Sequence, residues 1–427
     1  MVHSCLAADA PQTPRVNVEL INTGSELMLG RVLNTHQQWL CRRLADLGYV
    51  VTRQVAVADA GRDIETVVRE ALSRADLIIT TGGLGPTSDD ITRQLIAELL
   101  GKKLHDDAAI VQHIEQFFAS RKRPMPHSTR VQALVPEGAL VLANPHGTAP
   151  GLAIQVGDGR WLIMLPGPPR ELRPMFDASV VPLLQRSLPL SGGYICRNLR
   201  TCGVGESVAE EKIGELLKPL ITQGLDLGYC ARVGQVDIRL AASGERGVEL
   251  VRQGEAIVRE QLGRHIFGEN DDELEGVIVQ LLTERKQTLA LAESCTGGGI
   301  ANRITNIPGA SVVLLASLVT YANEAKQKFV GVRAETLAAN GAVSEAVARE
   351  MAEGARRETG ADYALSVTGI AGPGGGSDAK PVGTVFMALA SARETVVLKQ
   401  FNPFDRETFK NVTGTQVLEM LRRQIVT

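Results

Sequence analysis

The segment AESCTGGG at residues 292–299 places a hydroxyl, a thiol and three glycines directly after an apolar run. A serine at such a turn suits acyl transfer, because Ser294 could attack a carbonyl carbon while the backbone amides near Thr296–Gly298 hold the oxyanion. Two other interpretations stay open. Ser294 and Thr296 could be ordinary helix caps, and Cys295 could be the nucleophile if a cation or a histidine favoured its thiolate.

The base that such a nucleophile needs is not a histidine of the same region, since all seven histidines lie before Glu273. A Ser-His-Asp or Cys-His arrangement would require a residue from another domain or subunit. A lysine is the remaining economical candidate, because burial can lower the pKa of its amine toward neutrality. The segment TYANEAKQKFVGV offers Lys326 and Lys328, with Tyr321 at the end of a predicted strand, although a surface lysine would look the same in sequence.

A second strand and glycine loop, SVTGIAGPGGGS at residues 366–377, could wrap a ligand or lie free in solvent. Thr368 stands at the end of that strand and could bind an amide group. Arg406 opens the last predicted helix, where a positive charge opposes the helix dipole. That placement suggests a phosphate or carboxylate partner for Arg406.

The N-terminal half has its own glycine loop, TGGLGPTSDD at residues 81–90, between a buried strand and a helix. Glycines let the backbone approach a phosphate, and a helix N-terminus supplies free amides. The adjacent carboxylates of Asp89 and Asp90 suit a divalent cation, which could polarise a pyrophosphate. The alternative is that these residues only cap the helix, since Thr87 and Asp90 have capping-box spacing.

The elements that position these loops alternate between strand and helix, which predicts an α/β fold with mostly parallel sheets. Between about residues 188 and 267 the order is instead β-α-β-β-α-β, which predicts a small α+β connector followed by a polar linker at residues 268–272. Prolines in LPGPPREL suggest a domain boundary near Met175. The predicted parts are an extension at 1–15 and domains at 16–175, 176–268 and 269–427.

Composition limits the partners. The net charge is −3 over 427 residues, which gives no general attraction to nucleic acid. The longest uncharged apolar stretch, residues 312–322, is too short for a bilayer, and the N-terminus lacks the pattern of a signal peptide. Six cysteines without a CxxC pair fit a reducing compartment. We therefore expect a cytoplasmic protein with neither a membrane nor a nucleic-acid partner.

Four N-terminal segments resemble the molybdopterin-binding superfamily and, within it, the CinA family: the 81–90 loop, GSELMLGRVLNTH, NPHGTAPG and LPGPPREL. The resemblance implies a nucleotide pyrophosphatase that acts on ADP-ribose, with a divalent metal at Asp89 and Asp90. The nucleotide-binding residues that it implies are Glu26, Gly82, Gly83, Gly85, Thr87, Ser88, Asn144 and Gly147.

Five C-terminal segments in order, AESCTGG, VTYANEAK, GAVSE, SVTGIAGPGGG and KPVGTV, resemble the CinA C-terminal family, the nicotinamide mononucleotide deamidases. The resemblance implies Ser294 as nucleophile and Lys326 as its base, without a metal or other cofactor. The segment PFDR departs from the family's GDR-like motif at Phe404 but retains Arg406. The other site residues implied are Tyr321, Thr368, Thr296, Gly297, Gly298, Gly372 and Gly374.

Together these patterns predict a molybdopterin-binding-like α/β sandwich, a KH-type α+β connector and an α/β amidohydrolase domain. The resemblance further implies a homodimer and two substrates of NAD salvage, nicotinamide mononucleotide and ADP-ribose. Two alternatives remain, a pterin or molybdenum-cofactor-binding protein and a competence-related nucleic-acid-binding protein. The loop at residues 203–206 of the connector, GVGE, does not match the GxxG clamp of nucleic-acid-binding KH domains.

Overall fold

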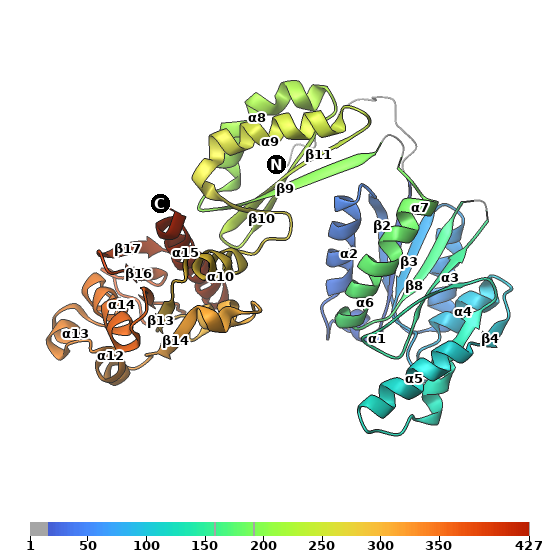
Figure 1. Ribbon diagram of the computed structural model, residues 1–427, viewed down its shortest axis with the longest axis horizontal. Coiled ribbons are helices and arrows are strands. Elements are labelled where there is room, and N and C mark those ends of the chain that lie inside the picture. Colours follow the sequence, from blue (N-terminus) through green and yellow to red (C-terminus); the bar gives the residue numbers. More distant parts are fainter. Residues whose placement is uncertain (1–15, 158, 191–192, 427) are drawn as a thin grey trace. The chain divides into compact units, whose positions relative to one another are not determined.

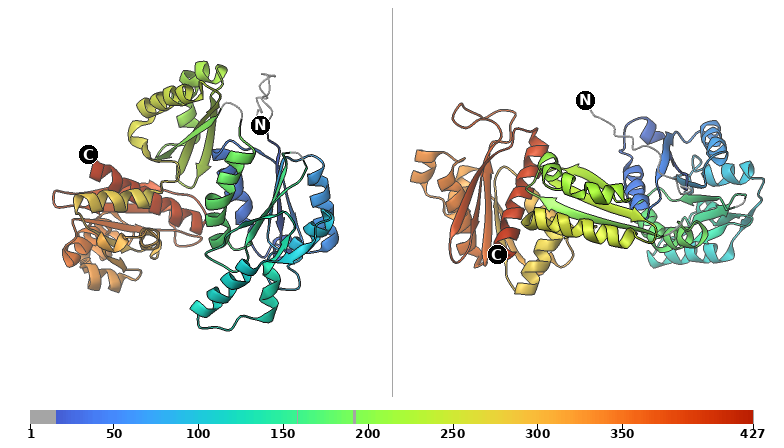
Figure 2. Two further views of the ribbon diagram at one scale, coloured as in Figure 1. Left: turned by 45° about the vertical axis from the view of Figure 1, so that its right-hand side comes forward. Right: turned by 90° about the horizontal axis from the view of Figure 1, so that it is seen from above.

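The computed structural model describes residues 16–157, 159–190 and 193–426 (Figure 1). The chain forms two compact units: one extends to Cys196 and includes Ser243–Val248, and the other comprises Arg197–Ala242 and the residues from Glu249 onward. Each unit packs helices against sheets (Figure 2), so the predicted α/β class is confirmed.

The central sheet of the first unit has six strands in the order β2-β1-β3-β8-β7-β6. The first four are parallel, whereas β7 pairs antiparallel with both β8 and β6. Every residue of β1, β3 and β8 is buried, as expected for strands that helices cover on both faces. The strands of this unit are β1 (Val18–Thr23), β2 (Val51–Val57), β3 (Leu77–Thr81), β6 (Leu140–Leu142), β7 (Gly151–Gln155) and β8 (Trp161–Leu165), with a separate pair β4 (Leu104–Asp106) and β5 (Leu134–Pro136).

Two apolar cores lie on the two faces of this sheet. One contains Leu40 and Leu44 of α2 with Leu172 of α6, and the other contains Ile64 of α3 and Ile96 of α4. The helices are α1 (Ser25–Met28), α2 (Thr35–Asp46), α3 (Gly61–Leu72), α4 (Thr92–Leu99), α5 (Ala108–Ser120), the 3-10 helix η1 (His127–Ala133), α6 (Pro169–Met175), the π-helix η2 (Phe176–Val180) and α7 (Val181–Ser187).

The first domain continues beyond Met175, where the sequence analysis placed its end. The segments α6, η2 and α7 follow one another without a break, and Phe176, Val180 and Leu184 pack into the same core as Leu172. The prolines of LPGPPREL end strand β8, but a proline is also well tolerated in the first turn of a helix, where Pro169 stands. They therefore mark the start of a helix rather than a domain boundary.

The connector has the predicted element order, with a sheet in the order β10-β11-β9-β12. The helices α8 and α9 lie together on one side of it (Figure 1), and Leu217 of α8 packs beside Leu225 and Leu240. The elements are β9 (Tyr194–Cys202), α8 (Glu206–Thr222), β10 (Asp226–Arg232), β11 (Gln235–Ser243), α9 (Gly247–Leu262), the 3-10 helix η3 (Gly263–His265) and β12 (Ile266–Glu269).

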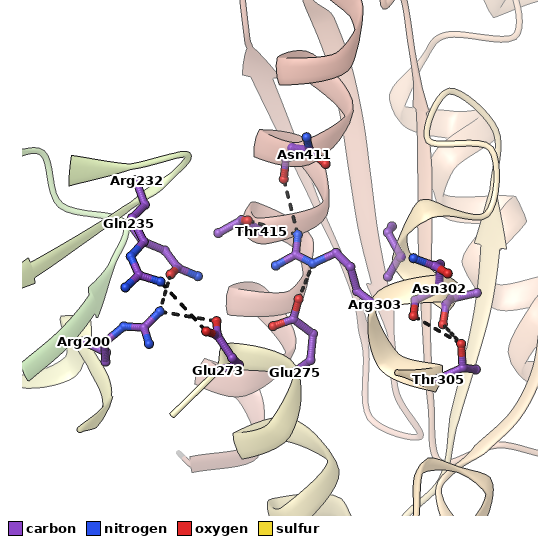
Figure 3. A network of polar contacts seen from close by, with 12 residues as sticks. Arg200, Arg232, Gln235, Glu273, Glu275, Asn302, Arg303, Thr305, Asn411 and Thr415 are labelled. Atoms are coloured by element: carbon purple, nitrogen blue, oxygen red, sulfur yellow. Dashed lines mark hydrogen bonds and ion pairs between the residues drawn. The ribbon is translucent and has the colours of Figure 1, made fainter. Parts of the chain in front are cut away.

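The predicted linker at residues 268–272 is bound to the connector sheet. Its first residues belong to β12, which pairs with β9, and the guanidinium of Arg200 donates to the carbonyl of Asp272 at 2.7 Å. Arg200 is 1% exposed and also pairs with Asp237 at 2.7 Å. Figure 3 shows Arg200 and Arg232 pointing toward Glu273, which precedes the first helix of the next domain. The buried Arg200 and the half-exposed Glu273 thus connect this junction to the connector sheet.

The last domain contains a five-stranded sheet in the order β14-β13-β15-β16-β17, in which β14, β13 and β15 are parallel and the last two strands are antiparallel. Helices α10, α11 and α15 share one core with the sheet, while α12 and α14 share another. The elements are α10 (Leu274–Arg285), β13 (Leu289–Glu293), α11 (Gly299–Thr305), the 3-10 helix η4 (Ala310–Val312), β14 (Leu314–Val319), α12 (Asn323–Val330), α13 (Ala334–Asn340), α14 (Glu345–Thr359), β15 (Tyr363–Gly369), β16 (Thr384–Ala390), β17 (Thr395–Phe401) and α15 (Arg406–Val426).

The register of this sheet brings two of the predicted site loops together. Glu293 at the end of β13 is aligned with Val367 of β15, so the residues that follow, Ser294 and Thr368, leave the sheet at the same edge. Ligands bind at the carboxyl ends of strands in such sheets.

No helix within the described ranges is both long enough and apolar enough to cross a membrane.

Candidate functional site

Ser294 and Lys326 meet in the C-terminal domain, although 31 residues separate them in the chain. Lys326 Nζ lies 3.2 Å from Ser294 Oγ. The same nitrogen donates to the carbonyl oxygens of Thr320 at 2.8 Å and Tyr321 at 3.2 Å. Lys326 is 1% exposed, and burial lowers the pKa of its amine because the charged form loses solvation.

This geometry suits a neutral lysine as a base. A neutral amine has two N–H groups, which the two carbonyl oxygens can accept, and its lone pair is then free to face the hydroxyl of Ser294. The sequence produces the arrangement locally, because Lys326 lies one helical turn from Val330 on the buried face of α12. The serine, by contrast, comes from the loop after β13.

Glu293, which the sequence analysis did not single out, holds the serine loop in place. Its carboxylate is 1% exposed and accepts hydrogen bonds around the start of α11. The donors are the hydroxyls of Thr296 at 2.7 Å and Ser317 at 3.5 Å and the amides of Gly298 at 3.0 Å, Ile300 at 3.1 Å and Ala301 at 2.8 Å. The available signal was a glutamate at the end of an apolar strand, since a buried charge needs partners.

These contacts correct one prediction about the oxyanion donors. The amide of Gly297 donates to the carbonyl of Ser294 at 3.0 Å, and the amide of Gly298 donates to Glu293 at 3.0 Å. Both amides therefore already donate hydrogen bonds inside the loop, one to the carbonyl that closes the turn and the other to the buried carboxylate. The amides of Cys295 and Thr296 are directed instead at the sulfur of Cys295, which is a weaker acceptor than an oxygen.

Cys295 does not have the surroundings of a reactive thiol. It is 5% exposed, and burial, the largest cause, raises the pKa of its thiol to about 12. Only a very small fraction would be thiolate near neutral pH, and the thiolate is the nucleophilic form. Of the two nucleophiles that the sequence left open, the geometry favours Ser294.

Three other predicted residues of this site, Arg406, Tyr321 and Gly372, are connected by hydrogen bonds. Arg406 donates to the hydroxyl of Tyr321 at 2.9 Å and to the carbonyl of Gly372 at 2.8 Å. Thr368 is buried and donates to the carbonyl of Ala342 at 2.8 Å. Gly374 lies in the exposed part of the glycine loop. Because Tyr321 also binds Lys326 through its carbonyl oxygen, the set runs from the serine to the arginine.

A second candidate site is a pocket of about 420 Å³ in the first unit. It lies where β1 and β3 end and where the glycine loop of residues 81–90 begins. The predicted residues that line it are Glu26, Gly82, Gly83, Gly85, Asp89 and Asp90. A side chain at Gly85 would collide with Asp90, since an added Cβ would lie 2.3 Å from its carboxylate. The glycines therefore let the loop fold back on itself beside the pocket.

Four predicted nucleotide-binding residues, Thr87, Ser88, Asn144 and Gly147, are not among the described residues that line this pocket. Thr87 donates to Asp90 through its amide and hydroxyl, which closes a turn before the helix. The helix-capping alternative is wrong, because α4 begins at Thr92 after Ile91 and has no side-chain cap. Asn144 donates to Glu171 at 2.8 Å. Gly147 leaves room for the same carboxylate, because an added Cβ would lie 2.0 Å from it. Asn144 and Gly147 therefore support the pocket wall at Glu171 instead of lining the pocket, and Ser88 is exposed.

The lining residues that the sequence did not predict include Asp59, Glu171 and Gln132. Glu171 belongs to LPGPPREL, which was noticed only as a motif and a boundary, while Asp59 follows β2. Gln132 lies in the 3-10 helix η1, where no local pattern marks it. It is 2% exposed, and its side-chain oxygen has no hydrogen-bond partner. Buried polar atoms are nearly always paired, so such an atom beside a pocket points to a ligand.

Three protein families match successive parts of the chain. They are described as "Probable molybdopterin binding domain" at residues 19–186, "Damage-inducible protein CinA KH domain" at 196–268 and "CinA C-terminal domain" at 271–425. The chain is therefore a three-domain protein with a molybdopterin-binding-like domain, a KH-type connector and a CinA C-terminal domain.

Whole-length relatives identify the family. A CinA-like protein of Gemmatimonas aurantiaca is 41% identical over 413 residues, 96% of each chain. A CinA-like protein of Akkermansia muciniphila is 43% identical over 406 residues, 95% of this chain and 96% of that one. The chain belongs to the CinA family, as the resemblance predicted. The crystal structure of competence/damage inducible protein CihA from Agrobacterium tumefaciens is 40% identical and covers 36% of this chain and 94% of that chain, with a TM-score of 0.35.

Proposed function

We propose that the C-terminal domain hydrolyses the carboxamide of nicotinamide mononucleotide to nicotinate mononucleotide and ammonia. The observation that carries the proposal is the buried amine of Lys326, held by two carbonyl oxygens and 3.2 Å from the hydroxyl of Ser294. A hydroxyl beside a neutral amine at the end of a strand is suited to acyl transfer. The family resemblance stated above supplies the substrate.

In the proposed reaction, Lys326 takes the proton of Ser294 as the serine oxygen attacks the carboxamide carbon. The amides of Cys295 and Thr296 stabilise the oxyanion, since those of the next two residues are engaged. The protonated lysine then gives its proton to the departing amine, which leaves as ammonia. A water molecule, deprotonated by the same lysine, hydrolyses the ester and restores Ser294.

The phosphate end of the nucleotide is proposed to bind Arg406. The guanidinium is exposed and is oriented by the hydroxyl of Tyr321 and the carbonyl of Gly372. Planar guanidinium groups suit phosphate oxygens. Thr368, fixed by its bond to Ala342, can still accept a hydrogen bond from the carboxamide nitrogen.

For the first domain we propose a pyrophosphatase that acts on ADP-ribose with a divalent cation. The pocket offers carboxylate oxygens, among them Asp89, and the amide oxygen of Gln132, which are ligands that hard cations prefer. The orphaned oxygen of Gln132 supports that fit. When bound, the cation would neutralise pyrophosphate charge, while the glycine loop would orient the nucleotide. A homodimer remains a prediction, as does a cytoplasmic location.

The test is to follow ammonia release from nicotinamide mononucleotide and AMP release from ADP-ribose by the full chain, with and without EDTA. We expect Ser294→Ala to abolish ammonia release only, and EDTA to abolish AMP release only. Loss of ammonia release with Cys295→Ala but not with Ser294→Ala would move the nucleophile to the thiol. A wild-type chain that releases no ammonia would refute the deamidase proposal.

A pterin ligand is the rival for the first domain, since one matched family is described as molybdopterin-binding. It is separated from ADP-ribose by competition. A pterin that binds more tightly than ADP-ribose, and without a cation, would favour the rival.

A further inference from the structure

The pocket of the first domain is lined by negatively charged side chains, which is unusual for a site that is proposed to bind pyrophosphate. Its described lining includes five carboxylates and no lysine, arginine or histidine. The carboxylates are those of Glu26, Asp59, Asp89, Asp90 and Glu171. Two arginines approach these carboxylates from outside the lining, Arg93 and Arg170.

Neither arginine is arranged to hold a phosphate. Arg93 is 3% exposed and donates to the carbonyl oxygens of Leu84 at 2.6 Å and Val131 at 2.8 Å. Arg170 lies 3.8 Å from the carboxylate of Glu171, and its side chain is 78% exposed. A pyrophosphate that entered this pocket alone would therefore meet mainly like charge, which repels it strongly in a partly desolvated site.

The carboxylates are equally unsuited to bind a cation alone. Within the described ranges, no three histidine, cysteine or acidic side chains stand close enough together to hold a metal ion. Two of the carboxylates already accept hydrogen bonds from backbone amides: Asp59 from Ser25 at the start of α1 at 2.8 Å, and Asp90 from Thr87 in the same loop at 3.0 Å. A cation with one or two carboxylates needs further oxygen ligands, and phosphate groups commonly supply them.

The unpaired side-chain oxygen of Gln132 is independent evidence that the pocket binds a ligand. Its side-chain nitrogen faces the carbonyl of Leu84 at 3.5 Å, which leaves the oxygen as the unpaired atom of a fully buried amide. An amide oxygen can coordinate a hard cation or accept from a ligand hydroxyl, but it cannot donate to a phosphate.

We propose that this pocket takes a divalent cation and a nucleoside pyrophosphate together, as one complex, and that the side-chain oxygen of Gln132 contacts that complex. The inference rests on the proposed pyrophosphatase function and adds to it: neither the cation nor the nucleotide binds well alone. Each supplies what the pocket lacks for the other, so their binding is thermodynamically coupled.

The experiment measures Mn²⁺ binding to the full chain by electron paramagnetic resonance, with and without α,β-methylene ADP-ribose, which cannot be cleaved at the bridge. We expect the analogue to tighten Mn²⁺ binding within the usual range of such coupling, about 5- to 150-fold. By linkage, Mn²⁺ must tighten binding of the analogue by the same factor. Tight Mn²⁺ binding that the analogue does not change would overturn the inference, as would equally tight analogue binding in EDTA.

Two substitutions test Gln132. Gln132→Leu removes the oxygen at similar size and is expected to reduce the coupling severalfold, whereas Gln94→Leu, at a glutamine that bonds Glu98 on the surface of α4, should leave it unchanged. Gln132→Glu adds a carboxylate and should strengthen Mn²⁺ binding without the analogue. If both Gln132 variants, folded by circular dichroism, bind like the wild type, Gln132 does not contact the complex.

Hydrolysis is measured separately, so that the two proposals can fail independently. Release of AMP from ADP-ribose without any coupling between Mn²⁺ and the analogue would refute the inference and support the pyrophosphatase. Coupling without AMP release would support the inference about binding and refute the pyrophosphatase.

Discussion

The two candidate sites differ in how complete they are within the chain itself. In the C-terminal domain the nucleophile and the base already touch, and Lys326 has its other hydrogen bonds filled by carbonyl oxygens. In the N-terminal pocket the carboxylates are spread around the cavity, and the oxygen of Gln132 is unpaired. A site that moves a proton needs its groups fixed beforehand, whereas a site for a charged phosphate can leave the counter-charge to a cation that arrives with it.

Both sites contain a similar local arrangement. Each loop follows a buried strand, and a carboxylate accepts a hydrogen bond from a backbone amide of that loop. Glu293, at the end of its strand, accepts from Gly298, and Asp90 accepts from Thr87. Glu293 is fully buried, while Asp90 lines an open pocket. Glu293 therefore only holds its loop, whereas Asp90 both holds its loop and faces the pocket.

Lys326→Met should have the largest effect. Removal of a general base costs about 10²- to 10⁴-fold in rate, so we expect ammonia release from nicotinamide mononucleotide to fall by that factor while AMP release from ADP-ribose stays at the wild-type level. Lys328→Met, two residues away on α12, is the matched control. If both lysine variants keep full deamidase activity, the Ser/Lys interpretation is wrong.

The pH dependence sharpens the same contrast. Burial lowers the pKa of Lys326 from 10.5, so kcat/KM for the deamidase should rise with pH and level off below pH 10.5, since the neutral amine is the base. Between the lowered pKa and 10.5 the unfolded chain binds more protons than the folded one, so stability should rise with pH there. Urea unfolding of wild type and Lys326→Met at several pH values measures this, and a difference that does not vary with pH would contradict it.

Arg406→Ala tests the phosphate end of the C-terminal site. Loss of a charge-assisted hydrogen bond costs about 1.5–3 kcal/mol, so KM for nicotinamide mononucleotide should rise roughly tenfold or more. With nicotinamide riboside, which lacks the phosphate, the variant and the wild type should differ little. Arg393→Ala, in the turn between β16 and β17, serves as control. An equal effect on both substrates would assign Arg406 to loop structure instead.

Glu293→Ala probes how the serine loop is held. The change leaves several amides and hydroxyls at the start of α11 without their acceptor, and we expect a loss of roughly 3 kcal/mol in stability of the C-terminal domain. Thermal unfolding measures it, with the exposed Glu284→Ala on α10 as control. A variant as stable as this control would mean that water replaces the carboxylate.

Cys295→Ala should have the smallest effect. Because burial raises the pKa of the thiol to about 12, the rate of ammonia release should stay within about twofold of the wild type, with a stability loss of about 1 kcal/mol from the small buried cavity. Steady-state kinetics and thermal unfolding measure the two quantities. A loss of activity comparable to that of Lys326→Met would reverse the choice of nucleophile.

Much of the fold and of the C-terminal site could be predicted from the sequence. Alternating apolar runs and glycine loops gave the strand ends, and the absence of histidine after Glu273 directed attention to Lys326. The pairing with Ser294 depended on the family resemblance as well, because no local pattern says which of two lysines on α12 turns inward. The oxyanion donors were misassigned because the loop geometry depends on Glu293.

The N-terminal pocket was harder to predict, since its walls come from separate parts of the chain. Glu171, Asp59 and Gln132 belong to α6, the end of β2 and η1, and each alone looks like an ordinary polar residue. Asn144 and Gly147 lie in one of the segments that carry the resemblance, but they support Glu171 instead of lining the cavity.

The positions where strands end and glycine loops begin follow from local sequence, because hydrophobic periodicity and backbone freedom are local properties of the chain. Which polar groups face a cavity and which hold a loop in place is set instead by the packing of distant elements. That choice depends on hydrogen-bond partners from distant elements, as the carbonyl oxygen of Thr320 does for Lys326 and the amide of Asn144 for Glu171. Burial makes these partners necessary, because a charged or polar group away from water needs a hydrogen-bond partner from the protein or from a ligand.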